Sequence, residues 1–487
     1  MAKAERFSSR WGLLLASIGM AIGAGNIWRF PRLVAQNGGS AFLIPWLIFL
    51  FLWSIPLLVA EFAIGKYTRK GTIGSFAEIL GKRFAWMGAF VGFCTMGIMF
   101  YYSVVTGWSL YYFFQAVGGH LLRIADHEGF WANFAASPWP LAFHALAIST
   151  AGYVIYRGIA GGVERVSKVF VPALFVLMII AAIRAVTLPH AATGLNYLFF
   201  PNLSKLVDYR VWLEALSQSA WSTGAGWGLV LTYAVYMRER EDIGLNAFLT
   251  GFGNNSASLI AALAIIPTIF SLLTHAEALQ AVRAGNTGLT FIWIPRLFEH
   301  MPLGRFFASV FFLAFFIAAL SSLIAMVELA VRIFIDFGMR RRRAVFWVWG
   351  GTLLLGVPSA LSLDFFNNQD WAWGLGLMVS GFFFALAVNR FGPERFRTRL
   401  VNTVPGDLKL GRWFNFLFRF VIPAEFVVML GWWFFQAITV YEPQSWWNPF
   451  RTYSLGTCIL QWGVVLVLFW ALNDTLVRKM EAAAHEG

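Results

Sequence analysis

The sequence predicts an all-α polytopic membrane protein of about twelve transmembrane helices, two of which are broken near their middle. Of the 487 residues, 59% are hydrophobic and only 13% are charged. Apolar runs of about 20 residues, the length that crosses a bilayer, recur along the chain. Two of these runs contain glycine clusters, within 19–25 and 224–228. Glycine costs a helix about 1 kcal/mol relative to alanine, so both runs are expected to open there.

The order of the spanning segments follows from hydropathy and length. They are expected near 11–36, 41–66, 86–117, 140–158, 165–186, 210–236, 243–270, 305–338, 343–361, 367–390, 414–438 and 449–475. The net charge of +13 is concentrated in alternate loops, at 66–83, 157–168, 340–343 and 390–412. This pattern predicts that these loops and both termini are cytoplasmic, and it argues against a nucleic-acid partner.

The first segment combines its glycines with polar residues at membrane depth. Gly19, Gly23 and Gly25 are followed by Asn26 and Arg29. An opened helix leaves backbone carbonyls unpaired, and the membrane tolerates them only where they face protein or a polar cavity. Carbonyl and amide oxygens are ligands of hard cations, so the sequence predicts an ion site at this break.

Breaks in the first and sixth segments predict two five-helix halves of inverted topology, an arrangement described for sodium-coupled transporters. The expected parts are a cytoplasmic N-terminus (1–10), a first repeat (11–186), an outer loop (187–209), a second repeat (210–390), and two last helices with a short cytoplasmic C-terminus (391–487). The alternative is that the glycines only allow close helix packing, because Gly19 and Gly23 are four residues apart.

Further polar side chains lie one helical turn apart, away from the ends of the segments. They form the pairs Gln218 with Ser222 and Asn254 with Ser258. In the eighth segment the backbone carbonyl of Ala318 lies one turn before Ser322, so that it can converge with the hydroxyls of Ser321 and Ser322. Such groups are costly in lipid and therefore predict a polar interior. The sequence contains no nucleophile–base cluster, no metalloprotease motif and no phosphate-binding loop, so no enzyme is predicted. Cys94 and Cys458 lie in separate apolar segments and predict no disulfide.

The chain resembles the neurotransmitter:sodium symporter family, especially its bacterial amino-acid transporters, over essentially its whole length. The resemblance rests on Gly-Ala-Gly-Asn-Ile-Trp-Arg-Phe-Pro at 23–31, Asn-Gly-Gly-Ser-Ala-Phe-Leu-Ile-Pro at 37–45, residues 61–66, two tyrosines at 101–102 and the broken sixth segment. It implies two sodium sites. One would use the carbonyls of Gly19, Ile22 and Ala318 with the hydroxyls of Ser321 and Ser322. The other would use the Ala21 carbonyl, Asn26, Ser222 and Asn254, completed by the carboxylate of the substrate.

The resemblance also implies a substrate pocket without charged side chains. Its residues would be Ala21, Ala24, Gly25, Ile98, Tyr102, Trp221, Ser222, Gly224, Trp227, Ser322 and Met326. Gly23 stands where monoamine transporters have an aspartate, so a substrate with its own carboxylate is expected. Trp227 replaces a frequent phenylalanine and should shorten the pocket, while Gly224 returns some volume. Small neutral amino acids such as glycine, alanine or N-substituted forms are favoured, and larger aliphatic or aromatic ones are the alternative.

Chloride dependence is a separate expectation. Chloride-independent relatives have an acid where Ser258 stands, and residues 243–270 contain none. Gln218, Ser222, Asn254 and Ser258 would then hold the anion. Trp46, which replaces the tyrosine of the family, counts against this because an indole has a single donor. The alternative is a proton on another acid, such as Glu214.

The resemblance implies two gates. Arg29 and Asp370 would form the outer gate above Trp221, which stands where the family has a phenylalanine lid. Asp336 and Tyr236 would belong to the inner gate, with Arg6 as the nearest candidate partner of Asp336. The predicted function is a sodium-coupled amino-acid symporter of a bacterial inner membrane. A non-transporting amino-acid sensor on the same scaffold is the alternative of another class, and monomer and homodimer both stay open.

Overall fold

The computed structural model describes residues 5–200, 202–404 and 408–486, which form α-, π- and 3-10 helices and no strand. The predicted all-α class is therefore confirmed. Residues 1–4 of the expected N-terminal segment, residue 201 of the outer loop, and residues 405–407 and 487 of the C-terminal part lie outside the described residues.

The first half of the chain contains five predicted spans and three connecting helices. Its elements are α1 (Arg10–Ala21), α2 (Ala24–Ile27), α3 (Arg29–Gln36), α4 (Ser40–Phe49), η1 (Leu50–Ser54), α5 (Ile55–Thr68), α6 (Thr72–Leu80), η2 (Lys82–Phe84), α7 (Ala85–Val117), η3 (Leu121–Arg123), α8 (His127–Ala135), α9 (Trp139–Tyr156), η4 (Ile159–Glu164) and α10 (Arg165–Val186). The connection between α7 and α9 therefore contains two short helices, η3 and α8, which hydropathy did not predict.

The second part begins with a connection that also carries helices, α11 (Ala191–Phe199) and η5 (Leu203–Val207). It continues with α12 (Tyr209–Ser222), α13 (Leu229–Ala234), α14 (Ile243–Leu272), α15 (His275–Arg283), α16 (Gly285–Gly288), η6 (Leu289–Trp293), α17 (Ile294–Glu299), α18 (Gly304–Asp336), α19 (Arg341–Leu355), α20 (Val357–Leu361) and α21 (Leu363–Phe391). The last elements are α22 (Pro393–Phe396), η7 (Arg397–Val401), α23 (Trp413–Phe416), η8 (Leu417–Val421), α24 (Ile422–Gln436), η9 (Ala437–Tyr441), α25 (Leu455–Ala471) and α26 (Asn473–Glu486).

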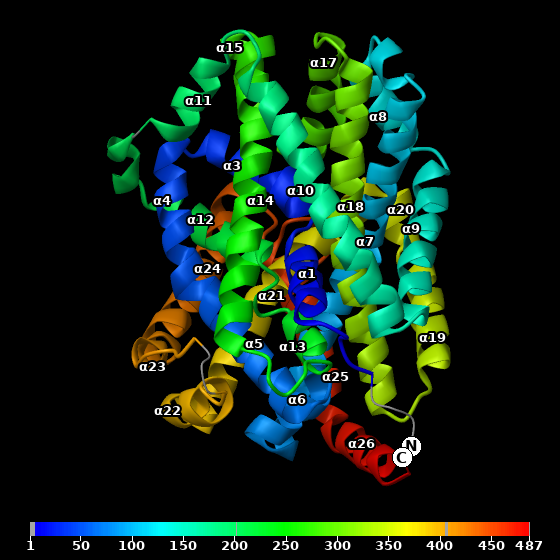
Figure 1. The fold of residues 1–487 in the computed structure, drawn as a ribbon, viewed down its shortest axis with the longest axis vertical. Coiled ribbons are helices and arrows are strands. Elements are labelled where there is room, and N and C mark those ends of the chain that lie inside the picture. The colour runs from blue at the N-terminus through cyan, green and yellow to red at the C-terminus, as the bar shows by residue number, and fades with distance from the viewer. Residues whose placement is uncertain (1–4, 201, 405–407, 487) are drawn as a thin grey trace.

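In the described part of the chain, 8 helices are long and apolar enough to cross a membrane, or up to 10 if each of two bent pairs is one span. The bent pairs are Arg10–Ala21 with Ala24–Gln36, and Leu455–Ala471 with Asn473–His485. The other two predicted positions correspond to α9 and to the interrupted pair α12 and α13. Figure 1 shows the long helices running along one bundle, with α15 at its upper end and α26 at its lower end. We call these the α15 end and the α26 end.

Both predicted breaks are present. The first span bends by 62° between α1 and α2, where Ile22 has an extended backbone (φ −81°, ψ 100°). The second break covers residues 223–228, between α12 and α13. It turns through three glycines with positive φ, Gly224 (69°), Gly226 (85°) and Gly228 (80°). Residues with a Cβ rarely adopt this conformation, so the glycine cluster is required by the backbone.

A buried carboxylate closes the second break. Glu61 of α5 is fully buried and accepts the backbone N–H of Gly226 at 2.6 Å and that of Leu231 at 3.0 Å. A helix that restarts inside a protein leaves its first N–H groups without carbonyl partners. Glu61 supplies the acceptors for two such groups.

The broken helices lie against the most buried part of the bundle. The central helix α18 packs along α7 and also contacts α10, α1 and α13. Its residues 318–331 are all buried. The two breaks thus face a helix that carries hydroxyl groups within an otherwise apolar core.

Candidate functional site

One cavity of about 490 Å³ joins the two helix breaks. Its walls come from the α1–α2 break, α7, the α12–α13 break, α18 and α21, and include Gly25, Tyr102, Ser222, Gly224 and Met326. The same cavity extends past Arg29 and Asp370 to Asn286 of α16, Tyr441 and Tyr453. It therefore leads from the helix breaks toward the α15 end of the bundle.

Asn26 of α2 organises a polar cluster beside the cavity. Its Nδ2 donates to Asn254 Oδ1 at 2.7 Å and to Ser258 Oγ at 2.8 Å, and lies 3.3 Å from Ser222 Oγ. Its Oδ1 accepts the N–H of Gly23 at 2.9 Å, which fixes the turn into α2. The side chain is 1% exposed. The structure thus brings together side chains from three predicted segments around one buried amide.

Oxygen atoms converge at the amide of Asn254. The amide atom that faces Asn26 lies 3.0 Å from the carbonyl oxygens of both Ala21 and Ser222. When that atom is Oδ1, it and the two carbonyl oxygens are three hydrogen-bond acceptors that face one another without a donor among them. Either the amide is rotated, so that Nδ2 donates to both carbonyls, or a cation binds the three oxygens. Neutral oxygen ligands of this kind suit a hard cation.

A second group of oxygens lies where α18 passes the end of α1. Ser322 Oγ donates to the carbonyl of Met20 at 2.9 Å and lies 3.4 Å from that of Ile22. A Cβ at Gly19 would lie 3.8 Å from Ser321 Oγ, which places this hydroxyl beside α1. Ser321 Oγ donates to the carbonyl of Ile317, one turn earlier in α18. Ala318 is buried on the same helix.

Tyr102 of α7 contacts the first break directly. Its hydroxyl accepts the N–H of Ala24 at 2.9 Å. A Cβ at Gly23 would lie 2.8 Å from this hydroxyl and 2.9 Å from Ser322 Oγ, so the packing leaves no space for a side chain at position 23. A Cβ at Gly25 would meet nothing within 4 Å. The free space of the break is therefore on the Gly25 side.

Beside Tyr102, the cavity is lined by the uncharged side chains of Ile98, Trp227 and Met326, while Arg29, Arg32 and Asp370 are its charged lining residues. Ile98 and Met326 are 1% exposed and Trp227 is 7% exposed. The expectation that Gly224 enlarges the pocket does not hold. A Cβ at Gly224 would lie 2.9 Å from Met20 Sδ, because the thioether fills the space that the missing side chain leaves.

The two members of the predicted outer gate are apart. No carboxylate among the described residues lies within 4.0 Å of Arg29, which donates to Ser217 Oγ at 3.3 Å instead. Its guanidinium carbon lies 5.1 Å from the ring centroid of Trp221, a cation–π distance. Asp370 lines the same cavity from α21. The passage between them is open in this conformation.

Of the four residues expected to hold chloride, three lie together. Ser222, Asn254 and Ser258 surround the amide of Asn26. Gln218 lines the cavity, is 1% exposed, and neither end of its amide has a partner among the described residues. The indole nitrogen of Trp46 is also a buried donor without an acceptor in the described ranges.

At the α26 end the predicted partner of Asp336 is wrong for this conformation. Asp336 pairs with Arg332, one turn earlier in α18, at 2.7 Å and accepts the N–H of Gly71. Arg6 lies 3.6 Å from Glu239 instead. The spacing of four residues between Arg332 and Asp336 was visible in the sequence and predicts such a pair. Tyr236 donates to the buried Glu328 at 2.6 Å, and Glu328 also pairs with Arg341.

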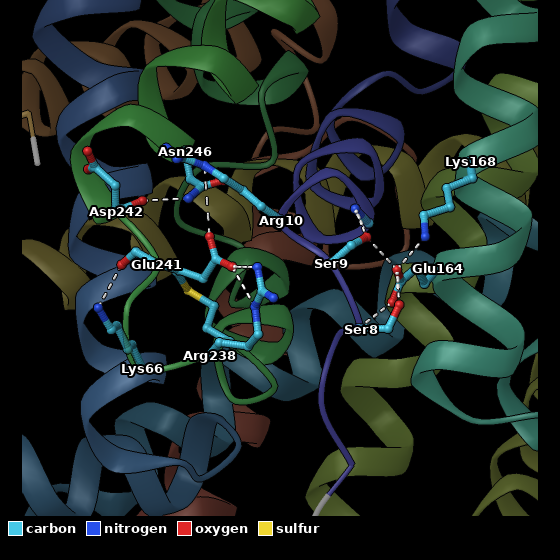
Figure 2. A network of polar contacts seen from close by, with 12 residues as sticks. Ser8, Ser9, Arg10, Lys66, Glu164, Lys168, Arg238, Glu241, Asp242 and Asn246 are labelled. Carbon is cyan, nitrogen blue, oxygen red and sulfur yellow. Dashed lines mark hydrogen bonds and ion pairs between the residues drawn. The ribbon is translucent and has the colours of Figure 1, made fainter.

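The start of α1 is held on two sides, as Figure 2 shows. On one side Glu164 accepts hydrogen bonds from Ser8 and Ser9 and pairs with Lys168 at 2.6 Å. On the other, Arg10 lies 3.9 Å from Glu241. Phe7, 2% exposed, donates its N–H to the carbonyl of Tyr236. The segment before α1 is therefore tied both to Glu164 and to the residues that follow α13. The sequence had not singled out Glu164 for this role.

Comparison with known proteins gives consistent matches along the chain. The model of the sodium:neurotransmitter symporter family matches residues 4–132 and 132–478. An uncharacterized sodium-dependent transporter of Methanocaldococcus jannaschii is 32% identical over 439 residues, which cover 86% of this chain and 88% of that protein. The uncharacterized sodium-dependent transporter YhdH of Bacillus subtilis is 30% identical over 449 residues, or 88% of this chain and 97% of that protein.

A eukaryotic relative and a solved structure extend these matches. The sodium- and chloride-dependent GABA transporter 2 of Bos taurus is 30% identical over 402 residues, or 72% of this chain and 65% of that protein. The crystal structure of MhsT in complex with L-phenylalanine matches with a TM-score of 0.75 at 30% identity. It covers 88% of this chain and 99% of the MhsT chain.

Proposed function

Because the chain belongs to the sodium:neurotransmitter symporter family, whose members are sodium-coupled membrane transporters and not enzymes, we propose that it imports a neutral amino acid together with sodium. The family accounts for the sodium dependence and the multi-pass membrane location. The proposal extends to the identity of the amino acid, the number of sodium ions and the dependence on chloride.

The convergence of oxygens at Asn254 carries the proposal. Its Oδ1 position lies 3.0 Å from two backbone carbonyls, those of Ala21 and Ser222, at the point where both broken helices meet. A sodium ion here would take these carbonyls, the Asn254 amide oxygen and the Ser222 hydroxyl as ligands, with Asn26 holding the amide in place. Both breaks contribute ligands, so binding of the ion would hold the two halves of the protein together.

A second sodium ion would lie between α1 and α18. Its ligands would be the carbonyls of Gly19, Ile22 and Ala318 and the hydroxyls of Ser321 and Ser322. The 3.4 Å distance between Ser322 Oγ and the Ile22 carbonyl supports this grouping. Ser321 would have to release its bond to the Ile317 carbonyl to take part. We place the two moving halves at 11–186 and 210–390.

The substrate carboxylate would lie at Gly25, where the break is open, and accept a hydrogen bond from the Tyr102 hydroxyl. There it would also face the ion at Asn254. A cation among neutral oxygens is stabilised by an adjacent anion, and the effect is reciprocal, so sodium and amino acid would each raise the affinity for the other. The uncharged walls formed by Ile98, Trp227 and Met326 support a neutral side chain.

Two substrate sizes remain candidates, each with its own support. Trp227 narrows the pocket and Met20 fills the space beside Gly224, which supports glycine, alanine or a similarly small amino acid. The similar MhsT structure contains L-phenylalanine, and the Trp221 indole lies close against Gly374 of α21 here, which supports a larger apolar side chain.

Chloride would be held near Gln218, Ser222, Asn254 and Ser258. The amide of Gln218 is a buried donor without a partner in the described part of the chain, and an anion would satisfy it, since leaving such a donor unpaired costs about 1–3 kcal/mol. A relative whose name includes chloride dependence is 30% identical. The alternative is a proton on another acid, for which Glu214 is the nearest candidate.

The α26 end would face the cytoplasm of a bacterial cell, as the loop charges predict, and the open cavity would face the outside. In this orientation Arg29 and Asp370 would close the outer passage once sodium and the amino acid have bound. The network of Asp336, Arg332, Tyr236 and Glu328 would then open on the inner side. Arg6 would contribute at the rim of that network through Glu239.

Uptake of radiolabelled neutral amino acids into proteoliposomes tests the proposal. An inward sodium gradient should drive accumulation of at least one amino acid, and replacement of sodium by potassium should abolish it. Replacement of chloride by gluconate should weaken it. Accumulation that does not depend on sodium would contradict the proposal, and binding without accumulation would favour a sensor.

A further inference from the structure

A glycine of α21 accommodates the indole of Trp221. A Cβ built at Gly374 would lie 1.9 Å from Trp221 Cζ2 and 2.0 Å from Cη2. Real Cβ atoms essentially never come closer than 3.0 Å to another heavy atom. The six-membered ring of the indole therefore occupies volume that every residue except glycine would fill. We call this contact the Trp221 seat.

The position of the seat connects it to the outer gate. Gly374 is four residues after Asp370 on α21, so both lie on the same face of this helix, one turn apart. Trp221 and Asp370 line the same cavity. The guanidinium carbon of Arg29 lies over the Trp221 ring, 5.1 Å from its centroid. Arg29 is thus held by the indole and by Ser217 while Asp370 stays unpaired with it.

The seat also determines where the indole can go. Trp221 meets Trp227 edge-on with ring centroids 6.5 Å apart, and both residues line the cavity. If position 374 carried a Cβ, the ring would have to move away from it by about 1.1 Å, since the 1.9 Å contact with Cζ2 must become at least 3.0 Å. The cavity is the space that Trp221 lines. Displacement would therefore reduce the room left for the side chain of a substrate.

We propose that Gly374 is a positioning residue that holds the Trp221 indole against α21 and thereby sets the largest substrate side chain that the pocket accepts. This inference rests on the proposed function, because it assigns a size limit to the same pocket. It goes beyond that proposal by naming a residue outside the pocket wall. Gly374 acts through Trp221 and does not touch the substrate.

Two variants and a control separate this role from a general loss of packing. Gly374→Ala places a Cβ in the seat. Adding Trp221→Phe removes the ring atoms that would clash with it, so the double variant should relieve the strain. Gly350→Ala is the matched control, because Gly350 is also inside a long apolar helix, α19, and a Cβ there would meet nothing within 4 Å.

The readout is KM for the smallest and the largest amino acids that the wild type accumulates. Gly374→Ala should raise KM for the largest by on the order of tenfold and leave that for the smallest within about twofold, since a methylene-sized change in a pocket has effects of this order. The double variant should recover the wild-type ratio and Gly350→Ala should not change it. Equal effects on both substrates, or no recovery in the double variant, would overturn the proposal.

A second readout does not require transport. Ile98→Cys places a thiol on the pocket wall, while the native Cys94 and Cys458 are buried. With Gly374→Ala, a displaced indole should slow modification of this thiol by a water-soluble methanethiosulfonate severalfold, and Trp221→Phe should restore the rate. Unchanged rates would overturn the role of the seat. If the wild type accumulates no amino acid, the proposed function fails, and this rate still decides whether Gly374 positions Trp221.

Discussion

Glu164 accepts two hydrogen bonds from Ser8, from its backbone N–H at 2.7 Å and its hydroxyl at 2.6 Å. The same carboxylate accepts the hydroxyl of Ser9, whose side chain caps the start of α1. A Cβ at Gly12 would lie 2.2 Å from the Glu164 carboxyl carbon, so the glycine leaves the space for this acid. The helix that carries the first break is therefore held at its beginning by a residue that directly precedes α10.

We expect Glu164→Gln to loosen the start of α1. A neutral amide has one acceptor oxygen and loses the pairing with Lys168, which removes about 1–3 kcal/mol of local stability. Backbone amides of residues 5–12 should exchange hydrogen on the order of tenfold faster by mass spectrometry. Glu239→Gln is the control, because the Glu239 side chain is 79% exposed and its pair with Arg6 is 3.6 Å long. Equal exchange in both variants would mean that Glu164 does not hold α1.

We expect Glu61→Gln to lower the thermal midpoint of the detergent-solubilised protein. The carboxylate accepts the N–H groups of Gly226 and Leu231, and an amide can accept only one of them, which costs about 1–3 kcal/mol. Glu425→Gln is a matched control. Glu425 is 8% exposed, and neither of its oxygens has a partner in the described part of the chain. A midpoint lowered equally by both changes would argue against the capping role of Glu61.

We expect Asn254→Ala to abolish stabilisation by sodium. A ligand at 100 times its Kd stabilises the folded state by about 2.7 kcal/mol, so wild-type protein should melt at a higher temperature in sodium than in potassium. The variant should melt equally in both salts. Asn246→Ala, two turns earlier in α14, removes only a hydrogen bond to the carbonyl of Asp242 and should keep the sodium effect. A sodium effect that survives in Asn254→Ala would place the ion elsewhere.

We expect Ser258→Glu to remove the effect of chloride on transport. Ser258 accepts a hydrogen bond from Asn26 within the cluster proposed to hold the anion, so a carboxylate there would supply the missing negative charge. Uptake by the variant should be the same in chloride and in gluconate, while wild-type uptake should fall in gluconate. If wild-type uptake is equal in chloride and in gluconate, a group other than chloride supplies the negative charge. Glu214→Gln should then change the pH dependence of uptake.

The helix breaks could be predicted because their cause is local. Gly224, Gly226 and Gly228 adopt positive φ, which other residues rarely do, and apolar runs of spanning length surround them. The clustering of Asn26, Asn254 and Ser258 followed from family motifs, since their contacts join segments more than 200 residues apart. Residue spacing within one helix cannot indicate such contacts.

Other features depend on which side chain fills a space. The sequence shows Gly224 as a potential gap, yet Met20 occupies it. Gly374 lies in an apolar run with other glycines, and only the packing of the bundle reveals that Trp221 rests on it. The pair of Arg332 with Asp336 is the exception, because a spacing of four residues on one helix is enough to indicate it, although Arg6 was the expected partner.

The central claim is that the substrate carboxylate and the sodium ion beside Asn254 share one site. The direct test is equilibrium binding of radioactive sodium to the purified protein with and without a saturating transported amino acid. The account predicts that the amino acid lowers the Kd for sodium, and that sodium lowers the Kd for the amino acid by the same factor, with both effects absent in Asn254→Ala. A sodium Kd that does not change when the amino acid is bound would contradict it.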